Sequence, residues 1–165
     1  MTKEIRRDVG LVFIMFLLSA AGMASVFKGY RLLAWVVIAS SDFHLFIVLL
    51  LAALLSDDED FLKRHRWMTA FLPRRRTAGL LVVTLLFAAV ISGFAGLYVG
   101  TEVFPVVKTP LDALYISSFT LALTDYSPKP GYGQLVVLAQ LVSSILLVVA
   151  LFPLIISRIS TFKHL

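Results

Sequence analysis

Residues 109–128 read T-P-L-D-A-L-Y-I-S-S-F-T-L-A-L-T-D-Y-S-P and lie between two long apolar segments. The stretch opens with the residues that start a helix. Thr109 can cap the N-terminus, Pro110 takes the first helical position, and Asp112 can return a hydrogen bond to the cap. The expected helix covers residues 110–121. It is too short and too polar to cross a bilayer, because a span takes about 20 mostly apolar residues.

A polar turn follows this half-length helix, and it contains Thr124, Asp125, Ser127 and Pro128. A short helix that points into a membrane and is followed by a polar segment has the outline of a pore loop. Irregular backbone at that depth is tolerated only inside protein or beside water. One such loop cannot enclose a pathway, so several subunits around an axis are required.

The same residues carry a resemblance to a known family. Asp112-Ala113-Leu114-Tyr115, with Ser117, Thr120 and Leu121, resembles the pore helix of the potassium channel superfamily. That family continues T-T-V-G-Y-G-D-x-x-P, whereas this chain continues A-L-T-D-Y-S-P over residues 122–128. G-Y-G is missing, and the D-x-[ST]-P that follows the filter is present. Gly133-Gln134-Leu135 resembles the G-R-L at the start of the family's inner helix, so the resemblance covers residues 77–158.

The missing glycines predict an altered filter. A potassium filter stacks rings of carbonyls by alternating left- and right-handed backbone, which requires glycine. No glycine occurs between Gly100 and Gly131. Two left-handed non-glycine positions in each of four subunits would cost about 8–16 kcal/mol. We interpret Gly131-Tyr132-Gly133 as a turn into the next span, with a relocated filter as the alternative.

The composition is that of an all-α integral membrane protein, since 59% of the 165 residues are hydrophobic. The net charge of +5 is confined to the ends and loops, which is typical of the positive-inside pattern and does not imply nucleic-acid binding. The chain has no cysteine, which excludes disulfides and thiolate metal sites. It has no nucleotide-binding loop, HExxH-type motif or nucleophile elbow, so we expect no enzyme and no cofactor.

The apolar segments predict one membrane domain in three parts. Residues 1–60 form a two-helix hairpin, with spans at 9–27 and 32–55. Residues 61–76 form a basic amphipathic helix that lies on anionic headgroups through residues 63–76; a solvated basic loop is the alternative. In the potassium channel family, a helix in this place joins an N-terminal module to the pore.

Residues 77–165 form the third part, the pore domain. It consists of an outer helix, the pore helix, the altered filter and an inner helix, at residues 77–100, 110–121, 122–128 and 134–158. Small residues recur at every fourth position of the outer helix, at Ala88, Ser92, Gly96 and Gly100. That spacing lets neighbouring helices approach closely.

The arginines of residues 61–76 predict the orientation of the chain. This segment is the most basic loop, so it and both termini are expected in the cytoplasm, and residues 101–108 outside. The basic start and long first apolar run favour a retained span over a cleaved signal peptide. We therefore expect a multi-pass protein of the plasma membrane, the inner membrane of the cell.

The candidate ion pathway follows from the resemblance. The pathway is expected to include residues of the pore helix and filter: Ser117, Thr120, Ala122, Leu123, Thr124 and Asp125. Ser117, Ser118, Thr120 and Thr124 are candidates for its narrow part, and Asp125 for a ring of carboxylates at the outer mouth. On the inner helix, Gln140 and Ser144 either face water or hydrogen-bond a neighbouring helix. Pro153 is the candidate gate hinge, because proline bends a helix and this one lies where the family places its cytoplasmic gate.

Asp42 and His44 lie near the middle of the second span. An aspartate there costs about 2.5–3.5 kcal/mol on insertion scales, so it needs a partner or water. Because they are two residues apart on a helix, Asp42 and His44 point to opposite sides and cannot hydrogen-bond each other. They are a proton or cation sensor, a conduction element, or partners in interhelical hydrogen bonds, with Ser19 or Ser25 as candidate donors.

The sequence thus favours a homotetrameric, potassium-channel-like cation channel with a weakly selective filter, whose permeant ions are K⁺ or Na⁺. One alternative is a channel fold without conduction, with a regulatory or structural role and a partner bound through residues 1–76. A third is a small transporter that uses Asp42 and His44.

Overall fold

The computed structural model describes residues 3–54, 73, 76–120 and 127–160, and all regular structure in these ranges is helical. The helices are α1 (Lys3–Lys28), α2 (Arg31–Leu54), α4 (Arg76–Thr101), α5 (Pro110–Thr120) and α6 (Tyr132–Ser160). The predicted linker helix at residues 61–76 lies outside the described residues, apart from Pro73 and Arg76, and Arg76 is the first residue of α4.

Four of these helices are long and apolar enough to cross a membrane. The candidate spans are Ile5–Lys28, Arg31–Leu50, Thr77–Thr101 and Tyr132–Val149. The prediction of an all-α, multi-pass membrane protein is confirmed at this level. α1 begins before its apolar run, so its first two turns carry charged residues, among them Lys3, Arg6 and Arg7. α6 runs as one helix through Pro153.

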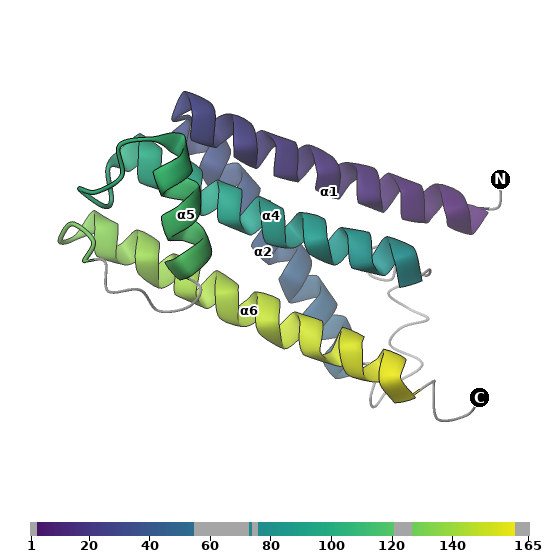
Figure 1. The fold of residues 1–165 in the computed structure, drawn as a ribbon. Coiled ribbons are helices and arrows are strands. Elements are labelled where there is room, and N and C mark those ends of the chain that lie inside the picture. The colour runs from purple at the N-terminus through teal and green to yellow at the C-terminus, as the bar shows by residue number, and fades with distance from the viewer. Residues whose placement is uncertain (1–2, 55–72, 74–75, 121–126, 161–165) are drawn as a thin grey trace.

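The helices form one bundle around α4, which packs most extensively on α1 and then on α2 and α5. Figure 1 shows that α1 begins and α6 ends at the same end of the bundle. The short helix α5 and the link before it lie at the opposite end, where α5 packs mainly on α4 and also reaches α6.

Small residues set the close contact between α1 and α4. A Cβ atom added to Gly22 would lie 2.1 Å from Ser92 Oγ, and one added to Gly96 would lie 2.1 Å from Ser25 Oγ. On the other side of α4, a Cβ atom at Gly93 would lie 2.8 Å from a side-chain carbon of Ile38 on α2. The packing role predicted for the small residues of this helix is confirmed at Ser92 and Gly96.

The core nearest α5 is built from aromatic and aliphatic side chains. Tyr98 and Phe104 are fully buried and pack edge to face, with ring centroids 4.9 Å apart. Ala113 and Ile116 of α5 and Val136 of α6 pack into the same cluster. This cluster places α5 against both α4 and α6.

Candidate functional site

The N-terminus of α5 is closed by a reciprocal hydrogen-bond pair, as the sequence predicts. The backbone N–H of Thr109 donates to Asp112 Oδ2 at 2.8 Å, and the N–H of Asp112 donates to Thr109 Oγ1 at 3.2 Å. The N–H of Lys108 also donates to Asp112 Oδ2, at 3.1 Å. These hydrogen bonds, led by that from Lys108, hold the pKa of the Asp112 carboxyl below its usual range.

The C-terminal turn of α5 is held by side chains of its neighbours. Ser117 is fully buried, and its hydroxyl donates to the carbonyl of Ile91 on α4 at 2.8 Å. Gln140 Nε2 on α6 donates to the Ser117 carbonyl at 2.7 Å and to its hydroxyl at 3.2 Å. The last four carbonyls of a helix have no partner within it, so Gln140 satisfies a group that would otherwise be buried without one.

Gln140 joins three helices. Its side chain is fully buried, and the Tyr98 hydroxyl of α4 donates to Gln140 Oε1. The Ser144 hydroxyl donates to the backbone carbonyl of Gln140 at 2.6 Å. Gln140 and Ser144 were expected either to face water or to hydrogen-bond a neighbouring helix. Gln140 hydrogen-bonds two neighbouring helices, α4 and α5. Ser144 is also buried, at 7% exposure, and bonds within its own helix.

The structure brings Ser117, Gln140 and Ser144 together, but inside one subunit. The three side chains are buried, and their polar atoms bond between and within the helices of the subunit. The place of these residues in an ion pathway stays a prediction. Sequence reasoning missed Tyr98, the fourth member of the group. The sequence indicates its role only by placing a tyrosine within an apolar span, because a buried tyrosine hydroxyl needs a hydrogen-bond partner.

The remaining predicted pathway residues are described only in part. Thr120 is the last residue of α5, and its side-chain surroundings lie outside the described part of the chain, as do those of Pro153. Ala122, Leu123, Thr124 and Asp125 lie outside the described residues. Their roles stay predictions.

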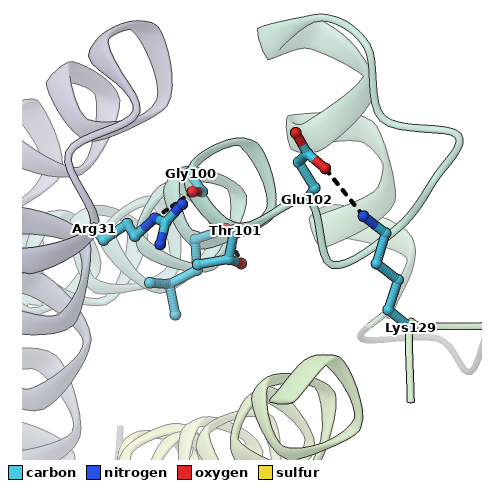
Figure 2. Close-up of polar contacts among 6 residues, drawn as sticks. Arg31, Gly100, Thr101, Glu102 and Lys129 are labelled. Atoms are coloured by element: carbon cyan, nitrogen blue, oxygen red, sulfur yellow. Dashed lines mark hydrogen bonds and ion pairs between the residues drawn. The ribbon is translucent and has the colours of Figure 1, made fainter. Parts of the chain in front are cut away.

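The segment that follows residues 121–126 is anchored to the end of α4. The Lys129 N–H donates to the Val103 carbonyl at 2.8 Å, and Lys129 Nζ lies 3.0 Å from Glu102 Oε2 (Figure 2). Hydrogen bonding to Lys129 lowers the pKa of the Glu102 carboxyl. Glu102 has a φ of 50°, a left-handed conformation that glycine more often supplies after a helix. Sequence reasoning missed this anchor.

A second contact at this end joins the α1–α2 hairpin to α4. Arg31 Nε, on the first residue of α2, donates to the carbonyl of Gly100, and Figure 2 shows the guanidinium against the end of α4. Gly100 permits the approach, since a Cβ atom there would lie 2.8 Å from Arg31 Cγ. The N-terminal hairpin is therefore fixed to the same end of the bundle as α5.

Asp42 makes an interhelical hydrogen bond, and its partner is on α6 rather than among the two candidate serines of α1. The Ser143 hydroxyl donates to Asp42 Oδ2 at 2.8 Å. The candidate partner Ser25 instead donates to the Gly22 carbonyl of its own helix, at 2.6 Å. His44 is buried, at 2% exposure, and lines a hollow between α1 and α2 together with Met15. The two residues point to different neighbours, as their spacing predicts.

The fold is that of a multi-pass α-helical membrane protein, with a short capped helix held at one end of the bundle. Comparisons of the chain with protein-family models, curated proteins and solved structures found no match. The resemblance to the potassium channel superfamily therefore rests on the motifs of residues 112–135 and their order along the chain.

Proposed function

We propose that the protein conducts monovalent cations passively, as a potassium-channel-like homotetramer with an altered filter. The observation that carries this proposal is the setting of α5. It is a half-length helix with a closed N-terminus and an anchored last turn, placed between two apolar helices long enough to cross a membrane. In the proposed assembly, four copies of α5 surround an axis, and residues 121–126 of each copy approach it.

The electrostatics of α5 favour cations in this arrangement. A helix carries about half a negative charge at its C-terminus, so four such ends aimed at one point attract cations. Gln140 takes up the Ser117 carbonyl. In the proposed assembly, the carbonyls of residues 118–120 face the pathway. Thr120 and Thr124 add hydroxyls, and Asp125 forms a ring of carboxylates at the outer mouth that disfavours anions.

The anchor at Lys129 supports this assignment. Residues 121–126 begin at the fixed end of α5 and are followed by a segment bonded to the end of α4 through Glu102 and Val103. A filter needs fixed ends, because its ion-binding groups act only when they are held in place. Without glycine, the backbone cannot form closely stacked carbonyl rings, so K⁺ and Na⁺ pass with similar ease.

Flux into liposomes that contain the purified protein tests this function. We expect uptake of K⁺ and Na⁺, and Asp125→Asn should reduce it most at low ionic strength, where screening is weakest. Asp57→Asn is the matched control, because it removes one carboxylate from the predicted cytoplasmic loop. Flux that is unchanged by Asp125→Asn at every salt concentration would remove Asp125 from the pathway.

A second candidate function is favoured by one observation. Three polar side chains in the middle of α6, those of Gln140, Ser143 and Ser144, are buried within the subunit. The exposed face of this part of α6 carries apolar residues, among them Leu138, Leu141 and Ile145. A channel fold that has lost conduction would keep this packing and serve a regulatory or structural role through residues 1–76. A tetramer that carries no cation flux under any condition would favour this function over the first.

A further inference from the structure

The long apolar stretches of the helices around Asp42 offer it no opposite charge. Residues 9–27, 77–100 and 133–149, which make up most of the spans of α1, α4 and α6, contain no Asp, Glu, Lys, Arg or His. The other charged or histidine side chain in the interior of α2 is His44, which points to a different side of the helix. A carboxylate without a countercharge is strongly disfavoured in the hydrocarbon region.

The two tyrosines of the neighbouring helices are already engaged elsewhere. The Tyr98 hydroxyl of α4 donates to Gln140, and the Tyr132 hydroxyl accepts a hydrogen bond from Trp35 Nε1 at 3.2 Å, at the start of α6. In the part of the chain that the structure describes, the side chain that hydrogen-bonds Asp42 is thus the Ser143 hydroxyl.

The hydrogen-bond geometry of Ser143 fits the protonated form of the Asp42 carboxyl better than the ionised form. Ser143 Oγ lies 2.8 Å from Asp42 Oδ2 and 3.1 Å from the Ala139 carbonyl oxygen. A hydroxyl has one hydrogen, so beside an ionised Asp42 it can satisfy only one of these two acceptors. A proton on Oδ2 removes the conflict, since Asp42 then donates to Ser143 and Ser143 donates to the Ala139 carbonyl.

Asp42 Oδ1 adds a second argument. This oxygen is buried and has no hydrogen-bond partner among the described residues. An unpaired oxygen costs much more on a carboxylate than as the carbonyl oxygen of a neutral acid, because the charged form has lost its hydration. Both oxygens of Asp42 are therefore accommodated better in the neutral form.

We propose that Asp42 is a proton-binding site within the membrane, and that its protonated carboxyl clamps α2 to α6 through Ser143. The Trp35–Tyr132 hydrogen bond joins the same two helices near the first residues of both. Release of the proton would leave an uncompensated charge where α2 meets α6. It would therefore weaken the contact between Asp42 and Ser143. The site depends on the packing of one subunit and does not rest on cation conduction.

Isotope-edited infrared spectroscopy of the full chain in liposomes tests this proposal. With ¹³C-labelled aspartate, the native protein at neutral pH should show the carbonyl band of a protonated carboxyl, and Asp42→Asn should remove it. Absence of the band from the native protein overturns the proposal without any variant. Persistence of the band in Asp42→Asn overturns it as well, since another aspartate would then carry the proton.

The clamp has a test of its own in the same spectra. Ser143→Ala removes the partner of Asp42 and should move the band to higher frequency, because the carboxyl loses its hydrogen bond. Ser144→Ala is the matched control, because that hydroxyl bonds the Gln140 carbonyl and should leave the band in place. An unchanged band in Ser143→Ala would show that Ser143 does not hold the carboxyl.

Discussion

Gln140 Nε2 on α6 donates a hydrogen bond to the backbone carbonyl of Ser117 at 2.7 Å, and so fastens the last turn of α5 to α6. With the cap at Thr109, this bond fixes α5 at both ends. The bundle then sets the direction in which α5 points. A helix of this length is not stable by itself, so it depends on these contacts.

Replacing Gln140 tests this support. Gln140→Leu keeps the bulk of the side chain but leaves the Ser117 carbonyl and the Tyr98 hydroxyl without their partner, so we expect a loss of about 1–3 kcal/mol in the free energy of unfolding. Gln134→Leu is the matched control, because Gln134 is exposed near the start of the same helix. Detergent-induced unfolding in mixed micelles, followed by helix content, measures both. Equal losses would mean that the buried network contributes nothing.

The contact between α1 and α4 predicts a difference between two glycines. Gly96→Ala places a Cβ atom 2.1 Å from Ser25 Oγ, so the helices must separate, at a cost of about 1–3 kcal/mol. Gly10→Ala meets nothing within 4 Å and should stabilise α1 by about 0.5–1 kcal/mol. The same unfolding assay compares them, and a stabilising Gly96→Ala would contradict the packing of the two helices.

The cap of α5 predicts a dependence on pH. The pKa of Asp112 is lowered in the folded protein by hydrogen bonds from Lys108 and Thr109. The stabilisation is therefore complete above the unfolded pKa of about 3.9 and is lost as the pH falls through the lower folded value. Asp112→Asn should remove this dependence, so its stability should approach that of the native protein in acid. A stability difference that stays constant with pH would argue against the cap.

Orientation in the membrane is a separate prediction. The chain has no cysteine, so a single introduced thiol reports on one position. Pro105→Cys lies in the exposed link between α4 and α5 and should react with an impermeant reagent added to intact cells. Lys163→Cys should react with the same reagent only after the cells are permeabilised. Labelling of position 105 from the cytoplasmic side alone would contradict both the orientation and the pore-loop arrangement.

Some of these features could be predicted from the sequence because they are local. The four apolar runs gave the candidate spans, and the Thr109–Asp112 spacing gave the start of α5, since both depend on residues close together in the chain. The partner of Asp42 could not be found in this way. Which face of α2 meets α6 depends on packing over the whole bundle, and the serines considered as donors, Ser19 and Ser25, are both on α1.

The same limit applies to Gln140 and to the Glu102–Lys129 pair. A glutamine in an apolar helix is compatible with a wet cavity and with a buried network, and only the position of α5 separates the two. Glu102 and Lys129 are 27 residues apart, and no periodicity relates them. The sequence thus singled out Gln140 but neither Glu102 nor Lys129, and the structure identified the partners of all three.

The reversal potential of purified protein in a planar bilayer, with K⁺ on one side and Na⁺ at equal concentration on the other, tests the central claim most directly. A pathway without glycine for a carbonyl filter should conduct both ions, so we predict a cation current that reverses near zero voltage. A strongly K⁺-selective current would show that residues 122–124 or 131–133 form a selective filter. Absence of any current would contradict conduction itself.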